Sequence, residues 1–235
     1  MKNLLSLILL ITTYNFAFQP EIVQKEIYKC TEDTSVYIKI NYPQIINLGN
    51  LEVQNKINAF LESEFTKALE SYNEFISDPE LLEYYPADWV FSFEVSFRTT
   101  YLSNELLSIV LDHIEFTGGA HHNYFSTGYN IRLSDGQLLK LDDIIKQNQF
   151  FNLSLFCEEE ILKIYNASSL AEAGFFDDEI IITPNQDFYV KPNYLVIQFD
   201  PYEIAPYSLG SIEIELRFDR LKLLLKPDIL FITNE

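Results

Sequence analysis

The side chains that first suggest chemistry are three histidines, His113, His121 and His122. The last two follow closely on Gly118 and Gly119, which permit backbone conformations closed to other residues. Neighbouring residues on a strand point to opposite faces, so two adjacent histidines cannot easily bind one ion. A zinc site needs three or four converging ligands, and no HExxH or His-x-x-x-His spacing occurs. We therefore expect no metal and no cofactor, and favour a structural turn in which one histidine is hydrogen-bonded.

Catalytic signatures of other kinds do not stand out. The sequence has no GxSxG elbow and no glycine-rich phosphate loop, and neither cysteine lies in a recognisable catalytic context. Carboxylate pairs such as Asp142-Asp143 are abundant, but with 35 acidic residues their proximity in sequence carries little information. The sequence favours a protein that is not an enzyme. The alternative is a hydrolase acting on wall glycan through His121 and a nearby carboxylate, with or without a metal.

A second segment, residues 200–210, reads DPYEIAPYSLG and suits recognition. Its two prolines limit the backbone, and its two tyrosines offer broad amphipathic surface at little entropic cost on binding. The competing interpretation is structural: the prolines fix a crossover between strands, and the tyrosine hydroxyls bind loop backbone. The candidate binding residues from both segments are Gly118, Gly119, His121, His122, Tyr202, Glu203, Pro206 and Tyr207.

Residues 1–18 have the layout of a secretory signal peptide, with Lys2 followed by an apolar run at 4–11. An uncleaved anchor is the competing interpretation, but this stretch is shorter than the roughly 20 apolar residues that cross a bilayer. We expect a periplasmic or secreted protein with no transmembrane anchor after cleavage.

Charge limits the partners. The chain carries 16 basic and 35 acidic residues, a net charge of −19, and loss of Lys2 with the signal peptide makes it −20. Such a chain repels nucleic acid and anionic lipid and attracts cationic partners. The alternative is that the negative charge of an exported protein only keeps it soluble.

Two cysteines, Cys30 and Cys157, remain after the expected cleavage. An even count in an oxidising compartment permits one disulfide, and the alternative is two buried thiols that act as apolar filler.

Hydrophobic periodicity predicts an α+β fold, with antiparallel sheet packed against a few helices in two small subdomains, residues 19–102 and 103–235. Residues 19–33 show no strong period, and one long amphipathic helix is expected at 50–77. Three strands of an antiparallel meander are expected at 89–97, 105–116 and 124–133. The remaining expected elements are helices at 141–145 and 150–165, a loop at 166–178, strands at 188–190, 194–199 and 212–218, and a short helix at 220–225.

Two sequence landmarks resemble one known group of proteins. The stretch TGGAHHNYFSTGYNIRLSDGQLLKLDDII at 117–145, followed by YEIAPYSLG at 202–210, is similar to the extracytoplasmic module of RsiV anti-sigma factors, which bind lysozyme. Together with INYPQI and NKINAF at 40–60, it also resembles the non-catalytic N-terminal region of PdaC-type peptidoglycan deacetylases. The resemblance covers most of residues 100–225, and less specifically 30–85.

The resemblance implies a binding protein of the bacterial cell envelope. RsiV-type proteins carry a sigma-binding segment and a membrane helix before this module, and PdaC-type enzymes append a deacetylase domain. Neither accompanies the module here, so we expect neither anti-sigma nor deacetylase activity. The implied partner is a basic lysozyme-like protein or peptidoglycan, contacted near His121 and the segment from Tyr202 to Tyr207.

Overall fold

The computed structural model describes residues 19–229, apart from 79, 81–85 and 87. The expected signal peptide therefore lies outside the described residues. Among the described residues, no helix combines the length and the apolar character needed to cross a bilayer.

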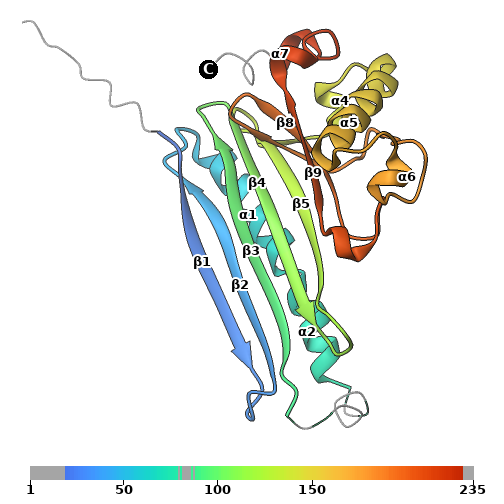
Figure 1. The fold of residues 1–235 in the computed structure, drawn as a ribbon. Coiled ribbons are helices and arrows are strands. Elements are labelled where there is room, and N and C mark those ends of the chain that lie inside the picture. The colour runs from blue at the N-terminus through green and yellow to red at the C-terminus, as the bar shows by residue number, and fades with distance from the viewer. Residues whose placement is uncertain (1–18, 79, 81–85, 87, 230–235) are drawn as a thin grey trace, which may run out of the picture.

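A six-stranded sheet forms the body of the protein, with the strands side by side in chain order (Figure 1). The strands are β1 (Glu21–Cys30), β2 (Val36–Ile46), β3 (Phe91–Leu102), β4 (Leu106–Phe116), β5 (Asn123–Arg132) and β6 (Gln137–Leu139). The expected meander is confirmed as β3, β4 and β5, which pair antiparallel. The α+β class is confirmed as well.

The antiparallel expectation is wrong for one pair, because β2 and β3 run parallel. Parallel neighbours need a long crossover connection, and here it contains α1 (Leu51–Thr66) and α2 (Ala68–Ile76). One continuous helix was expected at 50–77, but the structure divides it at Lys67, whose backbone stays in the right-handed helical region. Val53, Ile57, Leu61 and Phe65 recur every four residues along α1 and are buried against the sheet.

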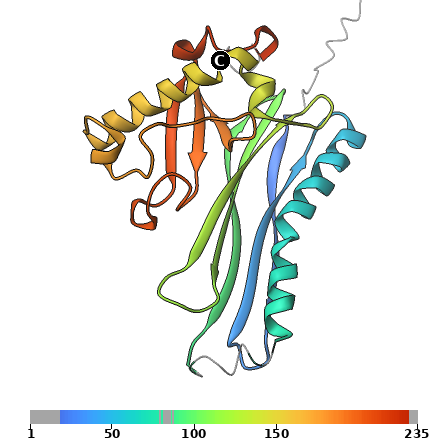
Figure 2. The same ribbon diagram turned by 90° about the vertical axis from the view of Figure 1, so that its right-hand side faces the viewer.

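A second, three-stranded antiparallel sheet follows, made of β7 (Phe188–Lys191), β8 (Tyr194–Phe199) and β9 (Ile212–Arg217). Figures 1 and 2 show α1 and α2 along one face of the large sheet and the C-terminal elements near one end of the other face. The remaining helices are α4 (Leu141–Ile144), α5 (Phe150–Tyr165), α6 (Leu170–Ala173) and α7 (Phe218–Leu221), with 3₁₀ turns η1 (Gln147–Gln149), η2 (Tyr207–Leu209) and η3 (Pro227–Ile229). The loop expected at 166–178 therefore contains α6, and the closing helix begins at Phe218 rather than at residue 220.

Two large hydrophobic cores lie in the part of the chain that the structure describes, with a small third cluster of Val110, Tyr189 and Val196 between the sheets. One lies between α1, α2 and the large sheet and draws its buried residues from 36–133; the other lies beneath α5 and the small sheet and draws most of its residues from 139–229. The expected subdomain boundary near residue 102 falls between β3 and β4, which are paired neighbours in one sheet, so the sheet runs across it.

The two cysteines are free thiols in this structure. Cys30 is exposed at the end of β1, whereas Cys157 is buried in α5 within the C-terminal core. The disulfide considered from the sequence is therefore absent. Burial raises the pKa of the Cys157 thiol to about 12, which keeps it protonated and unreactive.

The two sheets meet where the edge strand β7 crosses β5. An edge strand leaves backbone groups without a strand partner, and side chains of the large sheet satisfy them here. Asn130 Nδ2 donates to the Phe188 carbonyl at 2.8 Å, and the Val190 N–H donates to Ser108 Oγ at 2.9 Å. Ser108 Oγ in turn donates to Asn130 Oδ1 at 2.7 Å, and all of these groups are buried. We call this network the sheet junction.

Gly128 makes the sheet junction sterically feasible. A Cβ built on Gly128 would lie 2.1 Å from the Phe188 carbonyl oxygen, which is backbone and cannot swing away. The glycine is therefore required for close approach rather than for its own dihedral angles.

We expect the substitution Gly128→Ala to destabilise the protein by at least about 2 kcal/mol, because the added methyl must push β7 off β5 and break its buried hydrogen bonds. Urea denaturation measures the change. Gly49→Ala is the matched control, because its added Cβ meets nothing within 4 Å and should change stability by less than about 0.5 kcal/mol. Equal stability of the two variants would refute the close approach.

Asp187, the residue before β7, has a pKa raised from 3.8 to about 6 by burial and by the negative charges of Asp200 and Glu203. The folded protein therefore holds a proton that the unfolded chain has already lost, and folding stability falls as the pH rises through about 6. Asp187→Asn removes this penalty.

We expect Asp187→Asn to raise the melting temperature relative to the parent protein, with a gain that grows between about pH 4 and about pH 6 and then stays level up to about pH 8. Asp135→Asn is the control, and it should lower the melting temperature instead. A hydrogen bond from Arg132 lowers the pKa of Asp135, so the charged form of Asp135 stabilises the fold. An Asp187→Asn variant that melts lower than the parent at the higher pH would contradict this electrostatic assignment.

Candidate functional site

The β4–β5 hairpin loop begins the candidate site with two glycines in the left-handed half of backbone space. Gly118 has φ 102° and Gly119 has φ 107°, values that only glycine adopts without strain. An added Cβ at Gly119 would meet nothing within 4 Å, so the requirement comes from the backbone alone. The glycines thus shape the loop that presents His121 and His122.

Tyr207 joins this loop to the segment after β8. Its hydroxyl donates to the His122 carbonyl at 2.8 Å, and its ring stacks on His121 with centroids 3.9 Å apart and planes 20° apart. His121 Nδ1 lies 2.9 Å from the same His122 carbonyl, so it carries the proton and donates. Tyr124 meets the Tyr207 ring edge-on at 5.4 Å. The structure therefore brings together two sequence segments about eighty residues apart.

Tyr202 occupies a strained position beside this stack. The Glu203 N–H donates to the Asp200 carbonyl at 3.1 Å, which closes a turn with Pro201 second and Tyr202 third. The φ of Tyr202 is 69°, as the third position of a type II turn requires, and glycine normally takes that place. A bulky residue there is uncommon and costs free energy. Tyr202 is 59% exposed, and its ring lies 5.7 Å from the Tyr207 ring.

Two other predicted binding residues have structural contacts instead. The Glu203 carboxylate accepts from Gln186 Nε2 and from the Asp200 N–H, both at 2.9 Å, and so fastens the turn. Pro206 precedes η2 and accepts the Leu209 N–H at 2.9 Å. The structural interpretation of residues 200–210 therefore fits Glu203 and Pro206, while the binding interpretation of the loop stays a prediction.

We call the rings gathered here the aromatic surface, and define it by His121, His122, Tyr124, Tyr202 and Tyr207. His122 lies on its far side, with its ring 5.0 Å from Phe116. Burial, and then the nearby Tyr207, raise the pKa of Tyr124. Its hydroxyl thus stays neutral and available as a hydrogen-bond donor.

A polar network that the sequence did not reveal supports this surface. The Ser126 N–H donates to Asp200 Oδ1 at 2.9 Å, and Ser126 Oγ donates to Asp112 Oδ1 at 2.8 Å. Gln198 Nε2 donates to the Ser126 carbonyl at 2.7 Å. Burial raises the pKa of Asp200, and the Ser126 N–H opposes that shift. The loop after β8 is thereby fastened to β5.

A groove of about 380 Å³ runs beside Tyr124 along this network. Arg98 lines it and lies between two carboxylates, 3.2 Å from Asp112 and 2.8 Å from Glu213. Burial would lower the pKa of Arg98, but these two carboxylates outweigh it and raise that pKa. Arg98 and Asp112 lie on the neighbouring strands β3 and β4, whereas Glu213 lies on β9, about 100 residues further along the chain, so no local sequence signal could have grouped all three.

His113 lies apart from the other histidines. It is buried, its ring lies 4.5 Å from that of Phe125 at a tilt of 39°, and its Nε2 lies 3.4 Å from Glu115 Oε2. Within the described part of the chain, no group of three or more histidine, cysteine or acidic side chains is arranged to hold a metal ion.

Comparison with known proteins identifies both halves of the chain. Residues 30–124 match the family model described as deacetylase PdaC, and residues 142–219 match a model described as a protein of unknown function, DUF3298. Among curated proteins, the peptidoglycan-N-acetylmuramic acid deacetylase PdaC of Bacillus subtilis (strain 168) is 26% identical over 138 residues. The match covers 56% of this chain but only 29% of that relative.

Solved structures show the same fold. A DUF3298 family member from Bacteroides fragilis superposes with a TM-score of 0.70 at 18% identity, covering 91% of this chain and 96% of that one. A DUF3298 family protein from Pseudomonas aeruginosa gives 0.64 at 20% identity, covering 90% and 96%. The GGAH landmark lies in the PdaC match and the YEIAPY landmark in the DUF3298 match. The chain therefore carries a PdaC-type module followed by a DUF3298 module, and the aromatic surface is built from both.

Proposed function

We propose that this protein is a non-catalytic binding module of the bacterial cell envelope, and that it holds the glycan strand of peptidoglycan on the aromatic surface. The observation that carries the proposal is the stack of partly exposed rings from two modules, fixed by the Tyr207 hydroxyl on the His122 carbonyl. The name of the Bacillus relative, a peptidoglycan deacetylase, supports the choice of polymer.

The chemistry of the aromatic surface suits a sugar chain. Tyrosine and histidine rings offer apolar faces to the C–H faces of pyranose rings, and their polar edges can hydrogen-bond to hydroxyl and acetamido groups. The two carboxylates of the loop are already bound, that of Glu203 by Gln186 Nε2 and the Asp200 N–H, and that of Asp200 by the Ser126 N–H. A surface with so little unpaired charge favours an uncharged polymer backbone over a strongly charged partner.

Preorganisation adds to the argument. The rings are held by backbone turns, stacking and one buried polar network, so little side-chain freedom is left to lose when a ligand binds. Tyr202 in particular is exposed at a backbone position with positive φ, which glycine would adopt at a lower cost in free energy. A purely structural turn would gain nothing from that choice.

The hydrolase alternative would need a carboxylate positioned to assist His121. The described contacts of His121 are the His122 carbonyl and the Tyr207 ring. General acid–base catalysis requires a partner within hydrogen-bond reach, and these contacts supply none. The contacts of His121 and Tyr207 therefore favour a binding role over a hydrolase role.

A basic lysozyme-like protein remains the second candidate partner, favoured by one observation, the net charge of −19. Charge of that size speeds encounter with a cationic protein at low salt. Only an interface that persists at moderate salt would distinguish a specific complex from this general attraction.

We expect Tyr202→Ala to weaken binding of soluble peptidoglycan fragments by at least about tenfold, because it removes the most exposed tyrosine of the aromatic surface. Isothermal titration calorimetry with muropeptide oligomers measures this. Tyr28→Ala is the matched control: Tyr28 is 57% exposed against 59% for Tyr202, but lies on the edge strand β1. Its affinity should stay within about twofold of the parent protein.

Tyr202→Gly separates binding from folding. Because glycine relieves the positive φ, we expect this variant to unfold at the same or a higher urea concentration while losing binding as Tyr202→Ala does. Fragment binding unaffected by either Tyr202 substitution would sink the proposal. If the protein instead binds only a basic lysozyme, and still does so at moderate salt, that protein would replace the glycan as the proposed partner.

A further inference from the structure

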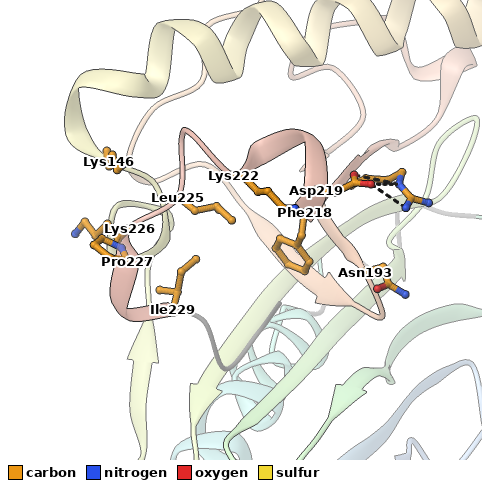
Figure 3. A pocket seen from close by; sticks show the side chains of 10 residues that line it. Lys146, Asn193, Phe218, Asp219, Lys222, Leu225, Lys226, Pro227 and Ile229 are labelled. Carbon is orange, nitrogen blue, oxygen red and sulfur yellow. Dashed lines mark hydrogen bonds and ion pairs between the residues drawn. The ribbon is translucent and has the colours of Figure 1, made fainter. Parts of the chain in front are cut away.

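A pocket of about 480 Å³ lies at the end of the small sheet away from the aromatic surface (Figure 3). Strand β8 begins at this pocket, beside Asn193, and ends at Phe199, while β9 returns from Ile212 to Arg217. Six residues of strand separate the two regions by about 20 Å. A small ligand therefore cannot contact both.

The pocket has an apolar floor. Phe218, Leu225 and Ile229 line it, and each is less than 10% exposed. Figure 3 shows these three side chains around a common space, with lysines on more than one side of it. The volume falls within the range of sites that hold small organic molecules.

The rim has the opposite charge to the protein as a whole. Among the residues that the structure describes, its charged lining residues are Lys146, Arg217, Lys222 and Lys226 against one carboxylate, Asp219. Arg217 and Asp219 pair with each other at 3.0 Å, which leaves the lysines as the uncompensated charge. In a chain with 35 acidic and 16 basic residues, such a local excess of cations is unexpected.

Backbone hydrogen bonds fix the segments that carry these lysines. The Lys146 N–H donates to the Leu224 carbonyl at 2.9 Å, and the Lys226 N–H donates to the Ile144 carbonyl at 2.8 Å. Lys146 Nζ also donates to the Leu223 carbonyl at 2.9 Å. The backbone of the two segments that carry Lys146 and Lys226 is thus held together at the rim.

We propose that this pocket binds a small organic anion, with a carboxylate or phosphate on the lysines and an apolar body on Phe218, Leu225 and Ile229. The site is separate from the glycan site, so it stands or fails on its own. Lysine ammonium groups bind carboxylate and phosphate oxygens as point charges, and the apolar floor adds affinity that an inorganic ion cannot gain.

The test uses four probes on the full chain: phenyl phosphate, benzoate, inorganic phosphate and benzyl alcohol. We expect phenyl phosphate or benzoate to bind at least about tenfold more tightly than inorganic phosphate or benzyl alcohol, since only the first two engage both rim and floor. NMR shift changes at Asn193, Lys222 and Leu225 report the location. The better of the two anions shows whether the pocket prefers phosphate or carboxylate.

The double variant Lys222→Glu, Lys226→Glu should lose at least about tenfold in affinity for the better anion. The matched control is Lys25→Glu, Lys29→Glu, two exposed lysines of β1, because it changes the net charge equally at a distant place. Equal loss in both variants would mean that only the net charge acts, and would overturn the proposal. So would benzyl alcohol binding as tightly as the anions, or no anion binding at all.

Discussion

The close approach of β7 to β5 at Gly128 is the constraint on which the rest of the structure depends. Only a residue without a side chain lets the Phe188 carbonyl come near enough for Asn130 and Ser108 to satisfy the free edge of β7. Because these polar groups are buried, separating the sheets would leave several donors and acceptors unpaired, at a cost of about 1 to 3 kcal/mol each. The sheet junction therefore fixes the DUF3298 module on the PdaC-type module in one orientation.

The candidate site is a consequence of that orientation. The loop after β8 reaches the β4–β5 hairpin only because β7 and β8 are already seated on the large sheet, and Ser126, Gln198 and Asp200 then fasten it. The hairpin contributes His121 and the loop contributes Tyr207, so neither module alone contains the stacked pair. Stability of the junction and geometry of the aromatic surface are thus coupled through two sets of polar contacts, one at the sheet junction and one beneath the loop after β8.

Sequence patterns predicted the elements that bury one clear face and missed those that do not. Alternation along β3 follows burial, with Phe91, Phe93 and Val95 inside, whereas β1 is an exposed edge strand whose charged residues hide any period. The parallel pairing of β2 and β3 has no local signal, because pairing direction depends on the crossover between the strands. The two halves of the candidate site were both found from glycine, proline and aromatic content. Their contact, and the Arg98, Asp112 and Glu213 network beside it, depend on tertiary packing that spacing cannot reveal.

The two proposed sites place different demands on the same acidic protein. An uncharged glycan on the aromatic surface neither gains nor loses from the net charge of −19, so affinity there must come from ring contacts and preorganisation. An anion approaching the lysine-rimmed pocket is repelled at long range, but at physiological ionic strength that repulsion is screened beyond about 8 Å. Binding in the pocket therefore depends on the lysines and the apolar floor immediately around the ligand. The local arrangement of charge, rather than its sum, decides which ligands each end of the small sheet can hold.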